Sequence, residues 1–111
     1  MIGPEGTPYA KGIFQLEILF PSDFPWIPPR IKFLTRVYHL NIDEFGLFCL
    51  GILKEFWSPA TSLEGILLQV YSILMEPEID YPKEKELAKL YLTDKKQYEA
   101  NAIEWTKKYA I

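Results

Sequence analysis

The chain has 111 residues, of which 49% are hydrophobic and 15% aromatic, and its formal net charge is −3. This length suits one compact domain over residues 1–111, and the apolar content is too high for a disordered chain. The negative charge argues against a nucleic-acid binder that depends on electrostatic attraction, and the apolar runs are too short to span a bilayer.

The chain contains one cysteine, Cys49, and one histidine, His39. A single cysteine forms no intramolecular disulfide, and one residue of each kind leaves too few ligands for a zinc site. The start of the chain shows no secretory signal. We therefore expect a protein of the cytoplasm or nucleus that uses no metal. We also expect that it uses no cofactor and acts as a monomer.

The first third of the chain predicts two strands. After a loop rich in turn formers at residues 3–9, residues 13–20 alternate with period two, which is typical of a half-buried strand. The apolar positions Phe14, Leu16, Ile18 and Phe20 share one face. A proline-rich turn follows, and residues 30–34 predict a second strand with Ile31 and Phe33 directed inward.

Residues 35–61 show no sustained periodicity. An irregular segment of this length inside a compact domain is usually functional or disordered, and its aromatic and apolar content argues against disorder. His39, Asn41 and Cys49 all fall within it. We therefore expect the functional residues of the chain to lie in this segment.

The remaining sequence predicts three helices. The first begins at a capping box from Thr61 to Glu64 and ends at Pro77. Its apolar stripe consists of Leu63, Ile66, Leu67, Val70 and Leu74. Pro82 is placed to open a second helix that runs to about Tyr91.

Thr93 and Asp94 are placed to cap the last helix, in which Tyr98, Ala102, Trp105 and Tyr109 form a stripe. Strands followed by helices indicate an α+β fold in which an antiparallel meander packs against helices.

Cys49 has two readings. Free cysteine is among the most buried residue types, so a purely structural role is the simpler one. Its place in the irregular segment favours a nucleophile instead, and a thiol suits thioester exchange because attack and departure are nearly balanced.

His39 and Asn41 are also open to two interpretations. His39 is better explained as an imidazole that hydrogen-bonds nearby backbone than as the base of a Cys-His hydrolase. Asn41 is either a turn residue or a neutral donor to a developing oxyanion.

Trp26 and the sequence Trp57, Ser58, Pro59 and Ala60 combine aromatic residues with prolines. Such segments are either core aromatics with turns or rigid partner-binding surfaces, because little entropy is lost when they dock. The Lys and Glu residues at 83–108 are most simply the solvated faces of helices.

Six motifs in fixed order resemble the ubiquitin-conjugating enzymes, specifically the short members with a catalytic domain and no extensions. They are Gly3-Pro4 through Tyr9, Phe20-Pro21, Tyr38-His39-Leu40-Asn41-Ile42, Gly46-Leu47-Phe48-Cys49-Leu50, Trp57-Ser58-Pro59-Ala60 and Trp105-Thr106-Lys107-Lys108-Tyr109-Ala110. The resemblance covers nearly all of the chain. It implies the fold of that family, here lacking the N-terminal helix and first strand.

The resemblance also implies roles for individual residues. Cys49 would accept ubiquitin from the activating enzyme as a thioester and pass it to a substrate lysine. Asn41 would stabilise the oxyanion or order the loop, and His39 would shape that loop. Trp26, Ser58, Pro59 and Ala60 would dock ligases of the RING or U-box type. Leu68 would contact the reactive ubiquitin, and ATP would be used by the activating enzyme.

Three positions depart from the family pattern. Leu40 replaces the proline between His39 and Asn41, and Gly51 stands where close relatives carry Asp. Tyr81 replaces an acidic residue that conditions the incoming lysine, although Asp80 is adjacent. A carboxylate there would orient the amine and help remove its proton, so we expect slower transfer to free lysine.

Two alternative functions stay open, the first of which these departures favour. One is a catalytically weak or inactive variant that binds ubiquitin or a ligase as a scaffold or decoy. The other is conjugation of a different ubiquitin-like protein, which the short segment at 54–56 disfavours because relatives that serve SUMO carry a longer insert there.

Overall fold

The computed structural model describes residues 1–47, 57–80 and 82–111. Within these residues the elements follow the order of two strands and then three helices: β1 (Leu16–Leu19), β2 (Arg30–Phe33), α1 (Leu63–Met75), α2 (Lys85–Thr93) and α3 (Lys95–Tyr109). The chain therefore has the predicted α+β class. None of the helices in the described ranges is long and apolar enough to cross a membrane.

The two strands form an antiparallel pair. Leu16 faces Phe33 and Leu19 faces Arg30 in the register. β1 is shorter than the predicted 13–20 because its flanks have other partners. Ile13 donates its N–H to the carbonyl of Ala110 (2.8 Å), and Phe14 donates to Met1 (2.8 Å).

Side-chain burial in the strands partly follows the predicted alternation. Phe14, Ile31 and Phe33 are buried as expected. Phe20, which the alternation places on the same face as Phe14, is 51% exposed, so that face is not buried at its end. Its ring instead packs edge-on against Phe24 in the turn between the strands (4.8 Å between centroids).

The helix starts follow local capping chemistry. Ser62, rather than Thr61, caps α1 by accepting the N–H of Gly65 (3.0 Å). Asp94 caps α3 by accepting the N–H of Gln97 (3.2 Å), as predicted. Each cap satisfies a backbone donor that has no partner inside its helix.

α2 does not begin at Pro82, contrary to the sequence prediction. The N–H groups of Lys83 and Glu84 both donate to the carbonyl of Leu40 (2.8 and 3.0 Å). These long-range bonds tie the residues just before α2 to the buried segment, and the helix begins at Lys85. The predicted stripe of α1 also needs correction, because Leu63 is 41% exposed while Ile73, which the stripe omitted, is buried.

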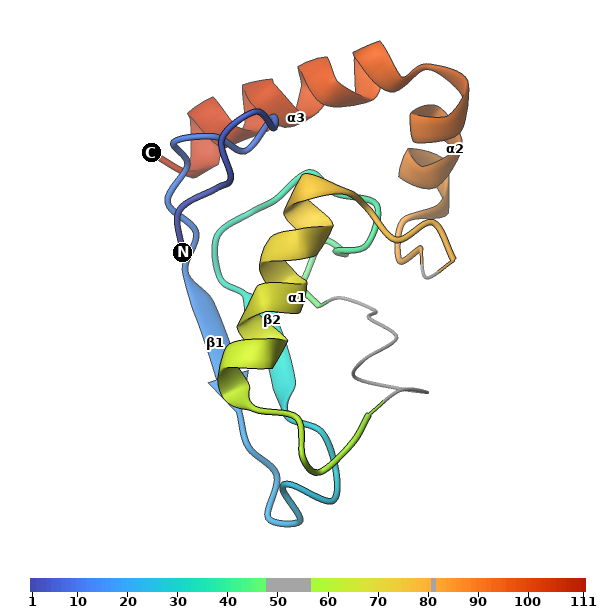
Figure 1. Cartoon of the computed structure of the whole chain (residues 1–111). Helices are drawn as coiled ribbons and strands as arrows, with labels where there is room; N and C mark the ends of the chain where they lie inside the picture. The colour runs from blue at the N-terminus through green and yellow to red at the C-terminus, as the bar shows by residue number, and fades with distance from the viewer. Residues whose placement is uncertain (48–56, 81) are drawn as a thin grey trace.

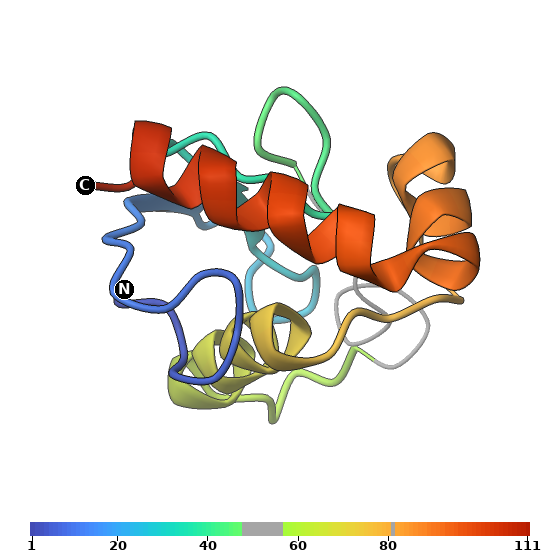
Figure 2. The ribbon, with the colours of Figure 1, turned by 90° about the horizontal axis from the view of Figure 1, so that it is seen from above.

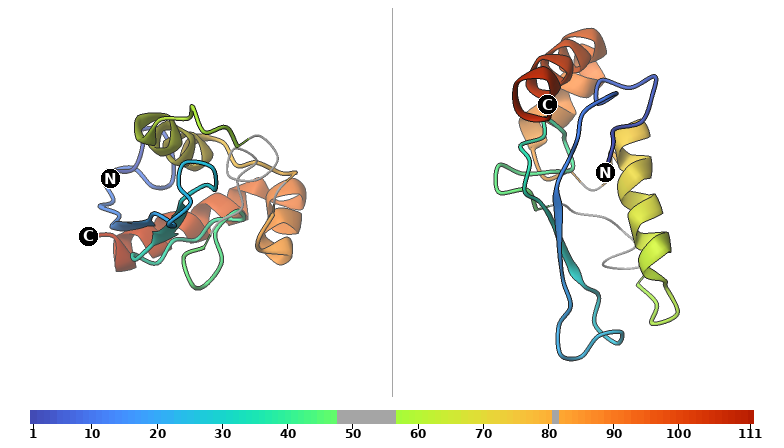
Figure 3. Two further views of the ribbon diagram at one scale, coloured as in Figure 1. Left: turned by 90° about the horizontal axis from the view of Figure 1, so that it is seen from below. Right: turned by 90° about the vertical axis from the view of Figure 1, so that its left-hand side faces the viewer.

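The core lies where α1, the strand pair and α3 meet. In Figure 1, α1 crosses in front of β1 and β2, and α3 runs across one end of the molecule. The side view in Figure 3 shows the strand pair and α1 as two layers beneath α3. The buried apolar residues that fill this space are Tyr9, Phe14, Ile31, Phe33, Val37, Ile42, Ile66, Val70, Ile73, Leu74, Ala102 and Ala110.

Candidate active site

The irregular segment after β2 runs through the interior of the molecule. His39, Leu40 and Asn41 have no exposed surface, and Ile42 is 2% exposed. Burying a polar side chain is unfavourable unless its hydrogen bonds are replaced, so the partners of His39 and Asn41 decide what the segment does.

His39 is held by backbone groups on both sides of its ring. Nδ1 accepts the N–H of Asn41 (3.0 Å), so Nδ1 carries no proton. Nε2 therefore carries the proton and donates to the carbonyl of Ile73 (2.6 Å). Ile73 lies in the last turn of α1, where backbone carbonyls have no N–H donor within the helix. His39 supplies a donor to one of these carbonyls.

Burial also keeps this imidazole neutral. Desolvation lowers the pKa of His39 from 6.5 to about 4, against the opposing effect of its bond to Ile73. The neutral tautomer is thus the stable form at physiological pH. These contacts confirm the prediction that His39 hydrogen-bonds nearby backbone.

Asn41 joins the irregular segment to the chain that follows α1. Its Nδ2 donates to the carbonyl of Glu78 (2.7 Å), and its Oδ1 accepts the N–H of Glu78 (2.9 Å). This two-point pairing fixes the orientation of the carboxamide. It also satisfies both backbone groups of Glu78, which has a buried Oε2 without a hydrogen-bond partner among the described residues.

Leu40, the residue between them, is held through its backbone. Its N–H donates to the hydroxyl of Tyr98 on α3 (3.0 Å). Burial raises the pKa of Tyr98 to about 12, so the phenol stays neutral. A proline at position 40 would have no N–H to donate, so the leucine is compatible with a tie to α3 that proline could not make.

A second hydroxyl reaches the same segment from the N-terminal loop. Tyr9 is 2% exposed and donates to the carbonyl of Tyr38 (2.6 Å). The segment 38–41 is therefore bonded to the N-terminal loop, to α1, to α3 and to Glu78. Its geometry is set by residues far away in the sequence.

The other predicted site residues near this segment are placed as follows. Asp80 is exposed, two residues beyond Glu78. Cys49, Gly51 and Tyr81 lie outside the described residues. No group of three His, Cys, Asp or Glu side chains in the described part of the chain is placed to hold a metal ion.

The two predicted docking segments lie next to each other. The indole N–H of Trp57 donates to the carbonyl of Pro25 (3.0 Å), and its ring lies 6.3 Å from that of Phe24. Trp26 is 75% exposed, and Ser58, Pro59 and Ala60 are exposed as well. They form one surface near the turn between β1 and β2, at the end of the molecule opposite α3 (Figure 1).

Leu68 lies on α1 and is 60% exposed. Its helix buries Ile66 and Val70 on the opposite face, so Leu68 is presented to solvent by the same periodicity that builds the core. A large exposed apolar side chain on a regular helix is suited to contact with a partner protein.

Sequence reasoning missed two residues that hold this site together, Glu78 and Tyr98. Glu78 bonds to Asn41 through its backbone N–H and carbonyl, which every residue other than proline has, so its residue type does not predict this contact. Tyr98 was assigned only to the apolar stripe of its helix. A buried tyrosine usually finds a hydrogen-bond partner for its hydroxyl, and this tendency alone indicates that Tyr98 has a polar contact as well as a packing role.

Comparison with known proteins gives a consistent result. A family model described as ubiquitin-conjugating enzyme matches residues 1–106. Among solved structures, the chain is similar to the E2 domain of a ubiquitin conjugating enzyme from Toxoplasma gondii, with a TM-score of 0.92 and 38% sequence identity. That match covers 100% of this chain and 77% of the Toxoplasma chain.

Proposed function

The chain belongs to the ubiquitin-conjugating enzyme family, and we propose that it carries ubiquitin as a thioester on Cys49. In this proposal the activating enzyme supplies ubiquitin, and a RING- or U-box-type ligase promotes its transfer to a substrate lysine. The proposed place of action is the cytoplasm or nucleus.

The chemistry consists of two acyl transfers. The Cys49 thiolate attacks the thioester carbonyl of ubiquitin on the activating enzyme, the C–S bond to that enzyme breaks, and its cysteine leaves as a thiolate. The substrate amine then attacks the Cys49 thioester, an amide bond forms, the C–S bond breaks, and the amine loses a proton. Both steps pass through a tetrahedral oxyanion.

Asn41 is the proposed stabiliser of that oxyanion. A neutral amide donates without the desolvation penalty of a buried charge, and catalysis by such a donor requires that it be oriented beforehand. The two-point pairing of Asn41 with Glu78 supplies this orientation. This buried pairing is the observation that supports the proposal most strongly.

Asp80 is the proposed partner of the incoming amine. Its carboxylate is exposed and lies close in sequence to Glu78, which pairs with Asn41. Such a group orients an ammonium and accepts its proton as attack proceeds. Tyr81 brings a phenol in place of a second carboxylate, so we expect discharge to free lysine to be slow and Tyr81→Asp or Gly51→Asp to accelerate it.

Ligase and ubiquitin contacts are proposed for exposed apolar residues. Trp26 with residues 58–60 would receive the ligase, and Leu68 would pack against the reactive ubiquitin. These residues are exposed rather than buried, so their apolar surface is available to a partner.

The direct test is thioester formation with activating enzyme, ATP and ubiquitin. We expect a ubiquitin adduct that disappears under reducing conditions and is absent in Cys49→Ala. Cys49→Ser is the matched variant, because a serine ester would survive the reductant. A reductant-sensitive adduct that persists in Cys49→Ala, or no adduct at all with folded protein, would contradict the proposal.

The scaffold or decoy function is the second candidate. The surface of Trp26 and residues 58–60 does not depend on Cys49 chemistry. Ligase binding without any thioester adduct would support this second function over the first.

A further inference from the structure

The residues from His39 to Ile42 form a β-turn inside the molecule. The N–H of Ile42 donates to the carbonyl of His39 (3.1 Å), and this bond closes the turn. Neither Leu40 nor Asn41, the two central residues, has a positive φ. Leu40 therefore occupies the second position of an ordinary turn, where φ is about −60°. Because Asn41 is the next residue, the contacts that hold this turn also set the place of the proposed oxyanion donor.

The N–H of Leu40 needs an acceptor from outside the turn. The other two N–H groups of the turn bond within it, that of Asn41 to Nδ1 of His39 (3.0 Å) and that of Ile42 to the carbonyl of His39. Leu40 has no exposed surface, so water does not replace the missing acceptor. The hydroxyl of Tyr98 accepts this N–H instead (3.0 Å).

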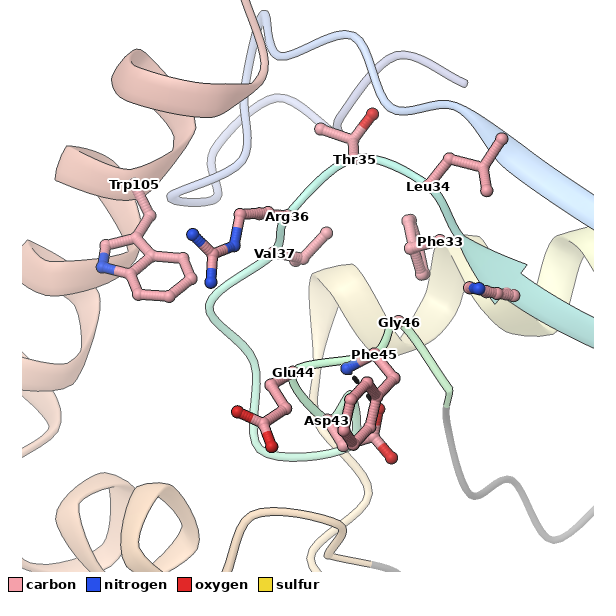
Figure 4. A pocket seen from close by; sticks show the side chains of 11 residues that line it. Phe33, Leu34, Thr35, Arg36, Val37, Asp43, Glu44, Phe45, Gly46 and Trp105 are labelled. Carbon is pink, nitrogen blue, oxygen red and sulfur yellow. Dashed lines mark hydrogen bonds between the residues drawn. The ribbon is translucent and has the colours of Figure 1, made fainter.

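The helix that carries this hydroxyl lies along the chain that leads into the turn. α3 lies over the stretch after β2 when the molecule is seen from above (Figure 2). The guanidinium carbon of Arg36 lies 5.7 Å from the ring centre of Trp105, and Figure 4 shows the two side chains directed toward each other. The ring of Tyr38 packs against that of Tyr98 (5.3 Å between centroids). Every second residue from Arg36 to Leu40 thus contacts α3.

The side chain of Tyr98 is itself held on several sides. It is buried, and its ring packs edge-on against Tyr91 of α2 (5.2 Å between centroids) as well as against Tyr38. Its hydroxyl also forms a hydrogen bond with that of Tyr9. A buried aromatic ring packed in this way has little rotational freedom, so its hydroxyl is a fixed acceptor.

We propose that Tyr98 is a positioning residue for the acyl transfer, because its hydroxyl holds the N–H of Leu40 and thereby fixes the turn that orients Asn41. Leucine has no ring to restrict its φ, and the bond to Tyr98 supplies a restriction of that kind. A turn released from Tyr98 lets the carboxamide of Asn41 leave its pairing with Glu78. This role rests on the proposed function, since the orientation serves the acyl transfer at Cys49.

The first measurement is the discharge of the Cys49 thioester to free lysine after charging has been stopped. Tyr98→Phe should slow discharge about tenfold at saturating lysine, because a small displacement of a positioned group lowers the rate steeply. The lysine concentration that gives half the maximal rate should not change, since Tyr98 is buried and does not meet the incoming amine.

A proline at position 40 provides the decisive comparison. In the Leu40→Pro background, Tyr98→Phe should slow discharge less than about twofold, because proline has no N–H to donate and its ring sets a φ that suits the second position of the turn. Leu40→Ala is the matched background, because alanine keeps the N–H and removes the buried side chain. There the tenfold loss should persist. The bond between Tyr98 and Tyr9 is lost equally in both backgrounds.

Tyr91→Phe controls for the loss of a tyrosine hydroxyl as such. The ring of Tyr91 contacts Tyr98, but its hydroxyl forms no hydrogen bond with any of the residues that the structure describes. This variant should change the discharge rate less than about twofold.

Hydrogen exchange keeps the test decisive if Leu40→Pro does not fold. In Tyr98→Phe the amide of Leu40 loses its acceptor, and the amide of Glu78 loses protection as Asn41 is released. Both should exchange at least about tenfold faster relative to the amide of Val70 in the middle of α1.

Equal losses from Tyr98→Phe in the Leu40→Pro and Leu40→Ala backgrounds would overturn the proposal, since the hydroxyl would then act other than through Leu40. A folded Tyr98→Phe protein in which exchange at Leu40 and Glu78 rises no more than at Val70 would overturn it as well. Because hydrogen exchange does not involve Cys49, a chain that forms no thioester counts against the proposed function, and the exchange rates still decide whether Tyr98 positions Asn41.

Discussion

The segment around Asn41 and the loops around Trp26 serve the proposed activity in opposite physical ways. His39, Leu40 and Asn41 have no exposed surface, and their polar groups bond to distant backbone. Trp26 leaves 75% of its surface exposed. Hydrogen bonds thus fix the conformation of the segment around Asn41, whereas the loop around Trp26 leaves apolar surface exposed to a partner.

This difference has a consequence for mutagenesis. A substitution in the buried segment should lower folding stability and chemistry together, because the same bonds support both. A substitution on the exposed surface should change binding and leave stability nearly unchanged. Four measurements test the contrast, in order of decreasing effect on the free energy of unfolding.

Asn41→Ala should have the largest effect, about 3 kcal/mol, because the N–H and carbonyl of Glu78 both lose their partner. Urea denaturation followed by circular dichroism measures it. Asn101→Ala is the control, since Asn101 also bonds through Nδ2, to the hydroxyl of Tyr38 (3.0 Å), but is only half-buried. An Asn41→Ala protein of unchanged stability would show that Asn41 has no structural role.

Acidification should have the next largest effect. The folded pKa of His39 is about 4, below the unfolded value of 6.5, so between these values the unfolded chain binds a proton that the folded chain does not. The stability from His39 is present above pH 6.5 and is lost as the pH falls toward 4. At pH 5 we expect a loss of roughly 2 kcal/mol relative to pH 7.

Denaturation midpoints measured between pH 5 and pH 7 provide the check. The chain has one histidine, so His39→Gln should remove most of the slope in this range, although it will also be less stable overall. A slope that is the same in the variant would assign the pH dependence to other groups.

Trp57→Phe should cost about 1 kcal/mol, because the aromatic ring is kept and the bond from Nε1 to the carbonyl of Pro25 is lost. Since this bond joins the two docking loops, ligase affinity should fall as well. Calorimetric titration with a RING domain would measure the affinity. Loss of stability with unchanged affinity would mean that the two loops bind independently.

Trp26→Ala should change stability least, by less than about 0.5 kcal/mol, because the side chain is largely in solvent. Its effect on ligase binding should be large, at least about tenfold, as expected for an exposed aromatic anchor. Leu19→Ala is the control, since Leu19 is another exposed apolar residue, in β1 (54%). Equal affinities of the two variants would place the ligase elsewhere.

The secondary structure was predictable wherever local chemistry decides it. β2, α1 and α3 follow from periodicity and caps, and Asp94, one of the two caps that the sequence predicts for the last helix, is the cap of α3. The predictions failed at two places where other contacts are made. α2 begins at Lys85 rather than Pro82, and the N–H groups before it bond to the distant Leu40. Phe20 turns outward to pack on Phe24 in the adjacent turn.

The candidate site divides in the same way. Residue types identified His39, Asn41 and Trp26, since each is unusual in an irregular or proline-rich segment. The partners of His39, Asn41 and Trp57 were not predictable, because Ile73, Glu78 and Pro25 contribute backbone atoms that any residue provides. The roles of Cys49 and Tyr81 stay predictions, as both residues lie outside the described part of the chain.

The carbonyl of Leu40 accepts both N–H groups that precede α2, while its N–H donates to α3. One residue thus joins three parts of the fold: the buried segment, the chain before α2, and α3. Native-state hydrogen exchange should therefore show a single cooperative opening, in which the amides of Leu40, Asn41, Glu78, Lys83 and Glu84 share one opening free energy. The residues proposed for catalysis would then lose their arrangement all at once rather than gradually.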